Sequence, residues 1–165
     1  MSRFVIPFRP NGKTRLGDPE LALAMLRDVE AAVTALGHAP LVVDRPGGQG
    51  EALAAALAGL DGPVTILNAD LPAVRSEEIE QLERAAPAVV AARDGTTNAV
   101  ALADARDYAP LYGPGSEGRF VRHLGAARLE LAGLRDDVDT WDDLERVRHL
   151  VGKFTRRYLD GRAGA

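Results

Sequence analysis

Short apolar segments of strand character alternate with helical patterns along most of the chain, and this alternation constrains the fold more than any other feature. Residues 64–67, Val-Thr-Ile-Leu, form a buried-type strand between a Gly-Pro pair and a polar loop. Residues 18–36 carry Leu26, Val29 and Val33 at helical spacing. Strands that alternate with helices favour a mainly parallel sheet with helices on both faces. We therefore expect an α/β protein with three layers, α/β/α.

The sheet is expected to be mixed, because residues 88–104 contain two strands around a glycine-containing turn. The 165 residues show no internal repeat or linker, which predicts a single domain over residues 1–165. Its last part, residues 151–165, is predicted to be a helix with a frayed tail. In such sheets ligands bind beyond the carboxyl ends of the strands, so the loops that follow strands are the first candidates for a site.

The other elements are predicted from local signals. A helix over residues 76–85 takes Ser76 as its N-cap. A later helix starts at Thr140, which has an acid three residues on, as in a weak capping box. Between these helices, residues 128–133 and 134–139 are short strand candidates.

Composition excludes several classes of protein. The net charge is -4, so a general nucleic-acid binder is not expected. The chain has no cysteine, which excludes disulfides, thiolate metal sites and cysteine nucleophiles. No apolar run approaches the length of a membrane span, and a strand begins within a few residues of the N-terminus, where a signal peptide would lie. We expect a cytoplasmic protein with no membrane partner.

A basic loop follows the first predicted strand, Arg3–Phe8, and carries Arg9, Lys13 and Arg15. Lysine binds phosphate as a point charge and arginine binds it bidentately, so the loop suits a polyphosphate. An ordinary solvated basic loop fits the sequence equally well. The Gly-Lys-Thr triplet is similar to the end of a P-loop, but a P-loop needs glycine where Pro7 stands.

Three aspartates are candidates for a magnesium site. Asp70 follows the strand over residues 64–67, and Mg²⁺ takes oxygen ligands that it usually shares with substrate phosphates. Asp137 and Asp139 are two residues apart, so they point the same way in an extended segment. Alternatively, Asp70 starts a turn and Asp139 caps the next helix, although a cap does not explain Asp137.

Two further segments offer groups that bind anions. Thr97 lies in the Asp-Gly-Thr-Thr-Asn segment, at the start of a predicted strand. Gly113 and Gly115 precede Ser116 at an expected helix start, where backbone N–H groups favour negative charge. Arg119, on that helix, adds a cation. Each segment alone is also compatible with an ordinary turn.

Taken together, these motifs resemble those of the guanylyltransferases of coenzyme F420 biosynthesis, and the resemblance covers nearly the whole chain. The motifs that carry it, in chain order, are VIPFRPNGKTRL, NADLP, DGTTNAVAL, YGPGSEGRFVRHL and DVDTWDDL. The resemblance implies a nucleotide-diphospho-sugar-transferase-like fold. It also implies that GTP is joined to a small phosphorylated carboxylic acid, such as 2-phospho-L-lactate or phosphoenolpyruvate, with release of pyrophosphate.

The resemblance assigns roles to particular residues, with Mg²⁺ as the cofactor. The implied metal ligands are Asp70, Asp137 and Asp139. The implied contacts to the phosphorylated acid are Thr97, Gly113 and Ser116. The implied contacts to the nucleotide are Pro7, Lys13, Arg15, Gln49, Gly50 and Asp70. Lys13 and Arg15 are also the expected catalytic residues, because they would stabilise the leaving pyrophosphate.

Other functions remain open at this point. The chain could be a nucleotidyltransferase of the same fold that acts on a sugar phosphate or a pterin, although the glycine-rich and Thr-Asn-Ala motifs argue against this. It could also be a GTP-binding paralogue without activity, although all three implied metal ligands are present. A homodimer is compatible with the sequence.

Overall fold

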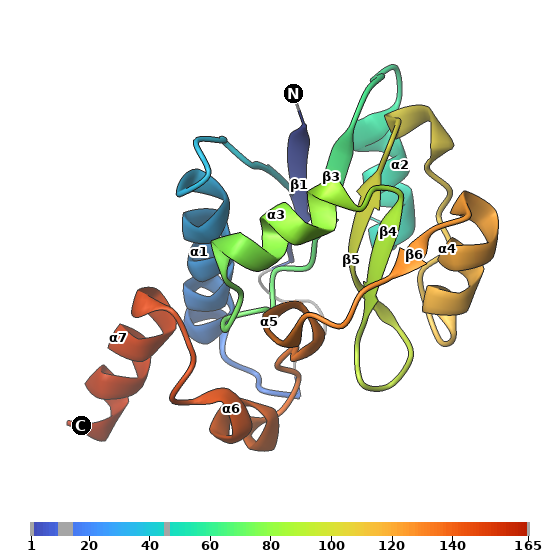
Figure 1. Ribbon diagram of the computed structural model, residues 1–165. Coiled ribbons are helices and arrows are strands. Elements are labelled where there is room, and N and C mark those ends of the chain that lie inside the picture. Colours follow the sequence, from blue (N-terminus) through green and yellow to red (C-terminus); the bar gives the residue numbers. More distant parts are fainter. Residues whose placement is uncertain (1, 10–14, 45–46, 165) are drawn as a thin grey trace.

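The computed structural model describes residues 2–9, 15–44 and 47–164, which form a six-stranded sheet flanked by helices (Figure 1). The strands are β1 (Arg3–Pro7), β2 (Leu41–Val43), β3 (Val64–Leu67), β4 (Ala88–Ala91), β5 (Thr97–Leu102) and β6 (Ala127–Arg128). The α-helices are α1 (Pro19–Thr34), α2 (Gln49–Leu57), α3 (Ser76–Arg84), α4 (Ser116–Leu124), α5 (Ala132–Arg135), α6 (Trp141–Val147) and α7 (Lys153–Ala163), with a 3₁₀ turn, η1, at Ala105–Asp107.

The sheet is mixed and mainly parallel, as predicted, with the strand order β2-β1-β3-β5-β4-β6. β1 is parallel to both β2 and β3, and β4 is parallel to β6. Only β5 runs against its neighbours, and Leu67 at the end of β3 pairs with Ala99 near the start of β5. The first residues of β5 therefore lie at the same edge of the sheet as the carboxyl ends of β1 and β3.

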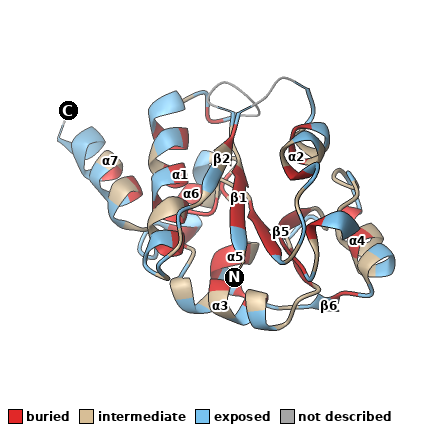
Figure 2. Cartoon of the chain, turned by 90° about the horizontal axis from the view of Figure 1, so that it is seen from above, coloured by how far each residue is buried: buried red, intermediate tan, exposed pale blue. Residues whose placement is uncertain are grey.

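The core is divided between the two faces of the sheet, as the side-chain alternation of a strand requires. In β1, Phe4 and Ile6 pack with residues of α1, α3 and α5, whereas Val5 packs with residues of α2 and α4. Figure 2 shows the buried residues concentrated on the strands between these helices. The three-layer arrangement that the sequence predicts is therefore confirmed.

Helix caps were predicted with mixed success. Thr140 caps α6, since its Oγ1 atom accepts a hydrogen bond from the Asp143 amide at 3.2 Å. Ser76 is not the N-cap of α3: the cap is Arg75, and Ser76 is the first helical residue. The Ser76 hydroxyl instead donates to the Ala32 carbonyl of α1 at 2.8 Å, because α3 packs against α1 closely enough to offer this acceptor.

The two short strand candidates near the C-terminal part were largely wrong. Residues 128–133 contribute only Arg128 to β6, and residues 134–139 form no strand. Leu131 and Leu134 are both buried and lie three residues apart, which is the spacing of a helical turn, and α5 forms there. The predicted C-terminal helix is present as α7. None of the helices in the described parts of the chain is long and apolar enough to cross a bilayer.

Candidate active site

Three carboxylates meet at the edge of the sheet where β3 ends. Asp70 follows β3, and Asp137 and Asp139 lie between α5 and α6. One carboxylate oxygen from each of the three lies within 4.8 Å of the others. The Val138 amide donates to the Asp70 carbonyl at 3.0 Å and so holds the two segments together. The structure thus brings together the three acids that the sequence singled out.

The segment before α6 is held in the conformation that presents two of these acids. Val138 is buried, with 2% of its surface exposed, whereas its neighbours Asp137 and Asp139 are half-buried. The Asp143 carboxylate accepts hydrogen bonds from the amides of Asp139 and Thr140, at 3.0 and 2.9 Å. The capping box of α6 therefore also positions the segment that carries the acids.

Asn98, the second residue of β5, connects to Asp137. Its side-chain amide donates to the Arg135 carbonyl at 2.9 Å and to Asp137 Oδ1 at 3.2 Å. Its own oxygen accepts from Asn68 at 3.3 Å, and Asn68 in turn accepts from Gln49 at 2.9 Å. A chain of side-chain amides therefore leads from the start of α2 to the acids.

The sequence hypothesis gave Asn68 no role and named no specific contact for Asn98. Both follow directly from strand positions: Asn68 comes directly after β3, and Asn98 lies at the start of β5. The signal that could have indicated them is the presence of amide side chains beside acids at strand ends. What the sequence lacked was the pairing of β5 with β3, which places Asn98 at this edge.

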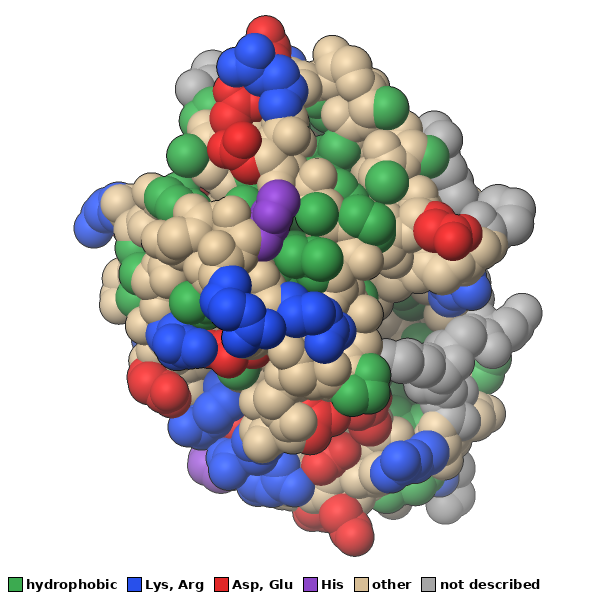
Figure 3. All heavy atoms as spheres, turned by 90° about the vertical axis from the view of Figure 1, so that its right-hand side faces the viewer, with side chains coloured by type: hydrophobic (Ala, Val, Ile, Leu, Met, Phe, Trp, Pro, Cys, Tyr) green, Lys and Arg blue, Asp and Glu red, His purple; other side chains and the backbone are tan. Residues whose placement is uncertain are grey.

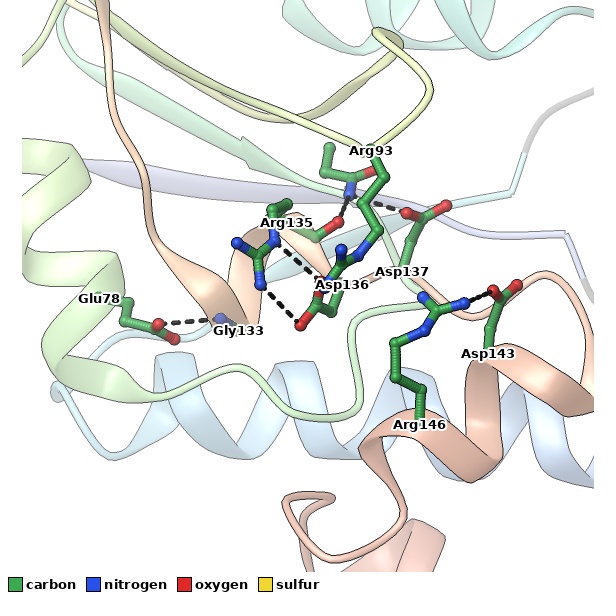
Figure 4. A network of polar contacts seen from close by, with 9 residues as sticks. Glu78, Arg93, Gly133, Arg135, Asp136, Asp137, Asp143 and Arg146 are labelled. Atoms are coloured by element: carbon green, nitrogen blue, oxygen red, sulfur yellow. Dashed lines mark hydrogen bonds and ion pairs between the residues drawn. The ribbon is translucent and has the colours of Figure 1, made fainter.

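The electrostatic environment of Asp137 differs from that of the adjacent Asp136. Burial raises the pKa of Asp137 to about 6, the hydrogen bond from Asn98 acts against this, and the charge of Asp139 adds to it. Burial would also raise the pKa of Asp136, but hydrogen bonds from Arg135 and Arg93 outweigh it and lower that pKa. Figure 4 shows the two arginines on Asp136, with Asp137 directed away from them. Asp136 is therefore a structural anion.

The acid cluster has the chemistry of a magnesium site. Its ligand atoms are carboxylate oxygens, which Mg²⁺ prefers. Like charges at this separation repel one another, and a divalent cation between them removes that repulsion. Asp70, Asp137 and Asp139 could therefore hold Mg²⁺.

A cavity of about 600 Å³ opens beside the acids, a volume typical of small-molecule sites. Five residues that the sequence assigned to ligand contacts line it, together with Asn68: Pro7, Gln49, Gly50, Asp70 and Gly113. Lys13 lies outside the described residues. Arg15 is exposed and is not among the described residues that line the cavity.

The α2 side of this cavity is closely packed against the segment before α4. The Tyr108 hydroxyl donates to the Gly50 carbonyl at 3.0 Å. A Cβ atom at Gly50 would lie 3.0 Å from the Pro110 side chain, a contact that forces a shift. Glycine at position 50 therefore allows the start of α2 to approach Pro110.

Thr97 and Ser116 are brought together but are enclosed. Their hydroxyl oxygens are 2.8 Å apart, and the two residues are 2% and 0% exposed. This contact joins the start of β5 to the start of α4. Neither residue is among those that line the cavity, whereas Gly113 is. Their predicted contact with a substrate stays a prediction.

Comparison with solved structures identifies the class of fold. A protein from Desulfovibrio desulfuricans, described as a candidate nucleotide-diphospho-sugar transferase, matches 95% of this chain and 97% of its own at a TM-score of 0.58 and 13% identity. A hypothetical transferase from Thermus thermophilus matches 87% of this chain and all of its own at a TM-score of 0.55 and 20% identity. The fold is that of the nucleotide-diphospho-sugar transferases.

Sequence comparison narrows this class to a family. The chain is 36% identical to phosphoenolpyruvate guanylyltransferase of Streptomyces scabiei, with 92% of each chain covered. It is 34% identical to 2-phospho-L-lactate guanylyltransferase of Methanosphaerula palustris, covering 89% of this chain and 81% of the relative. No family profile matches the chain. The chain belongs to the phosphoenolpyruvate and 2-phospho-L-lactate guanylyltransferase family.

The chain is shorter than its Streptomyces relative. Their alignment spans 201 residues, more than the 165 of this whole chain, so the relative contains segments that are missing here. The acids of the cluster are nevertheless present and converge.

Proposed function

We propose that this protein is a magnesium-dependent guanylyltransferase that joins GTP to a small phosphorylated carboxylic acid and releases pyrophosphate. The observation that carries the proposal is the convergence of Asp70, Asp137 and Asp139 beside the cavity. Membership of the guanylyltransferase family supports the nucleotide and the acid as substrates, because relatives in that family are named for them.

In this proposal the acids hold Mg²⁺, which when bound stabilises charge on the phosphate oxygens. Lys13 and Arg15 contact the triphosphate and stabilise the leaving pyrophosphate. Pro7, Gln49 and Gly50 line the nucleotide side of the cavity.

The phosphorylated acid takes the side of the cavity formed by Gly113. Ser116, a predicted contact together with Thr97, adjoins this loop, since its amide donates to the Gly113 carbonyl at 3.0 Å. The buried hydroxyl pair of Thr97 and Ser116 joins β5 to α4 and so fixes the start of the helix that follows this loop.

The reaction needs no general base. A phosphate oxygen of the acid forms a bond to the α-phosphorus of GTP, the bond to the bridging oxygen of the β-phosphate breaks, and that electron pair leaves with pyrophosphate. A phosphate monoester has a second pKa of about 6 and is largely ionised at neutral pH, so it carries no proton that must be removed. The chain's contribution is to position the reactants and to stabilise charge.

Pyrophosphate release tests the proposal. The purified protein is mixed with Mg²⁺, GTP and one acid at a time: phosphoenolpyruvate, 2-phospho-L-lactate or 3-phosphoglycerate. Release that depends on one acid and on Mg²⁺ supports the proposal and names the substrate. A folded protein that binds GTP but releases no pyrophosphate with any acid contradicts it. Replacing GTP by ATP or CTP in the same assay measures selectivity for the base.

A further inference from the structure

The loop before α4 is held from behind by one arginine. Arg119 Nε and Nη2 donate to the Leu111 carbonyl at 3.1 and 2.9 Å, and Nη1 donates to the Pro114 carbonyl at 2.8 Å. Nη2 also lies 3.5 Å from the Tyr112 carbonyl. A single guanidinium therefore contacts three carbonyl groups of residues 111–114. From the sequence, Arg119 was expected to act as a cation beside an anion, whereas the structure directs its donors at the backbone.

These contacts determine which way the loop amides point. A trans peptide unit is planar, and its N–H points opposite to its C=O. The Leu111 carbonyl shares a peptide unit with the Tyr112 amide, and the Pro114 carbonyl shares one with the Gly115 amide. Because Arg119 binds both carbonyls, the amides of Tyr112 and Gly115 point away from it. The Tyr112 carbonyl sets the Gly113 amide in the same way. Successive backbone N–H groups on one side of a loop form an anion-binding surface.

Two glycines make this loop geometry possible. Gly113 has φ of 120° and Gly115 has φ of 71°, in the region that other residues avoid. The added Cβ atoms would lie 3.6 and 3.7 Å from the Arg119 guanidinium, so both glycines pack beside it. Tyr112 and Gly113 also line the cavity, as does Asp70 of the acid cluster. The loop thus has one side on Arg119 and another on the cavity.

We infer that Arg119 is a positioning residue that aims the backbone N–H groups of Tyr112, Gly113 and Gly115 at the phosphorylated acid. This inference rests on the proposed function, which it deepens by assigning the acid's binding to a backbone surface held by one side chain. Arg119 itself does not contact the substrate, because its donors are engaged by the loop carbonyls. Lysine cannot replace it, since an ammonium group does not present a planar fork to several acceptors.

The first test compares Arg119→Lys and Arg119→Ala with Arg122→Ala. Arg122 is exposed on the same helix. Figure 3 shows several Lys and Arg side chains at the surface on the side of the molecule where α4 lies in Figure 1. We expect both Arg119 variants to raise KM for the acid by about 10-fold to 100-fold, because a displacement of about 1 Å in a positioning group has effects of this size. KM for GTP should stay within about twofold of wild type in all three variants.

Chemical rescue separates positioning from a general loss of structure. Millimolar guanidinium added to Arg119→Ala should lower KM for the acid toward the wild-type value and should have no such effect on Arg119→Lys, whose side chain occupies the same space. An unchanged KM for the acid in Arg119→Ala, or an equal rise in KM for GTP, would overturn the inference.

A second measurement does not require turnover. In protein labelled with ¹⁵N-glycine, phosphoenolpyruvate or 2-phospho-L-lactate should shift the amide signals of Gly113 and Gly115 but not that of Gly59, at the end of α2. The shifts should be lost in Arg119→Lys. If wild type shows the shifts but releases no pyrophosphate, the proposed transfer fails and the loop's role in binding stands. If wild type shows neither, both are overturned.

Discussion

Buried or half-buried aspartates occur in two regions of this protein, and their surroundings in the two regions are opposite. Where α7 packs on α1, Asp28 is 5% exposed and accepts hydrogen bonds from the amides of Phe154 and Thr155, both at 3.0 Å. At the edge of the sheet, Asp70, Asp137 and Asp139 face one another. The first carboxylate is surrounded by donors, and the other three are placed beside like charges.

This difference distinguishes a carboxylate that stabilises the fold from carboxylates that form a candidate metal site. Asp28 lies at the N-terminus of α7, where backbone N–H groups and the helix dipole favour an anion. The packing is close: a Cβ atom at Gly152 would lie 2.4 Å from Asp28 Oδ1, so this position requires glycine. At the sheet edge, burial and the charge of Asp139 instead raise the pKa of Asp137, so its charged form is disfavoured until a cation binds. Residues of the first kind should affect folding, and residues of the second kind should affect activity.

The largest expected effect that tests this contrast is on turnover. Asp70→Asn should lower kcat by about 10²–10⁴-fold, because a metal ion contributes several kcal/mol of charge stabilisation to such a reaction. Its free energy of unfolding should equal or exceed that of wild type, because one of three clustered charges is removed. Pyrophosphate release and urea unfolding measure the two quantities. Asp160→Asn, an exposed acid on α7, is the control, and near-normal turnover of Asp70→Asn would exclude Asp70 as a ligand.

Asp28→Ala should show the opposite behaviour. It should lower the free energy of unfolding by about 1–3 kcal/mol, because two amides at the start of α7 lose a charged acceptor. Its kcat at 25 °C should stay close to the wild-type value, because Asp28 is not among the residues that line the cavity. Asp28→Asn keeps one acceptor oxygen, so its free energy of unfolding should lie between those of wild type and Asp28→Ala. A loss of activity without a loss of stability would remove the distinction between the regions.

Asn98→Ala should weaken binding of the metal without abolishing turnover. Residues that orient metal ligands typically contribute about 10–100-fold to affinity, and Asn98 holds Asp137 at 3.2 Å. Calorimetric titration with Mn²⁺ in the absence of substrates measures this directly, and saturating Mg²⁺ should restore most of kcat. Ser76→Ala also removes one side-chain hydrogen bond, the one to the Ala32 carbonyl of α1, and serves as the control. Equal affinity in the two variants would show that Asn98 does not position Asp137.

The smallest expected effect is the change of metal affinity with pH. With the pKa of Asp137 at about 6, half of the metal-free molecules carry a proton there at that pH, and Mn²⁺ affinity should be about twofold lower at pH 6 than at pH 8. Affinity should fall further below pH 6, and Asp137→Asn should abolish this dependence.

The same pKa predicts the sign of a stability effect in metal-free protein. Because the folded state binds the Asp137 proton more tightly than the unfolded state, whose value is near 3.8, this group contributes stability at low pH. That contribution is fully present below about pH 4 and is lost as pH rises through about 6. The difference in unfolding free energy between wild type and Asp137→Asn, followed from pH 4 to pH 7, isolates it. A difference that grows in the other direction would contradict the raised pKa.

Much of the fold and part of the site could be predicted because the signals are local. The strand over Val64–Leu67 was predicted with its observed bounds, since its apolar run is bounded by turn residues. Thr140 was predicted as a cap because the capping box spans only four residues. The position of Asp70 followed from a general rule, that sites lie beyond the carboxyl ends of strands, whereas Asp137 and Asp139 reach this edge from the segment between α5 and α6.

Other residues were assigned wrongly or incompletely because their partners are distant in sequence. Ser76 is a residue type favoured at the N-cap, but it is the first residue of α3, and its hydroxyl donates to the Ala32 carbonyl of α1, 44 residues away. Thr97 and Ser116 were expected to face a substrate, and the structure adds a mutual contact that depends on how β5 and α4 pack. Neither contact has a signature within a few residues.

The sequence by itself determined the alternation of strands and helices, the three-layer arrangement and the identity of the clustered acids. Only the tertiary structure decided that Asn98 holds Asp137, that Asp28 caps a helix 126 residues further along the chain, and that Arg119 is directed at the backbone. The reason is physical. Strand and helix periodicity and caps depend on neighbours within one or two turns, whereas a buried carboxylate or guanidinium takes whichever partners the packed elements bring within hydrogen-bond distance.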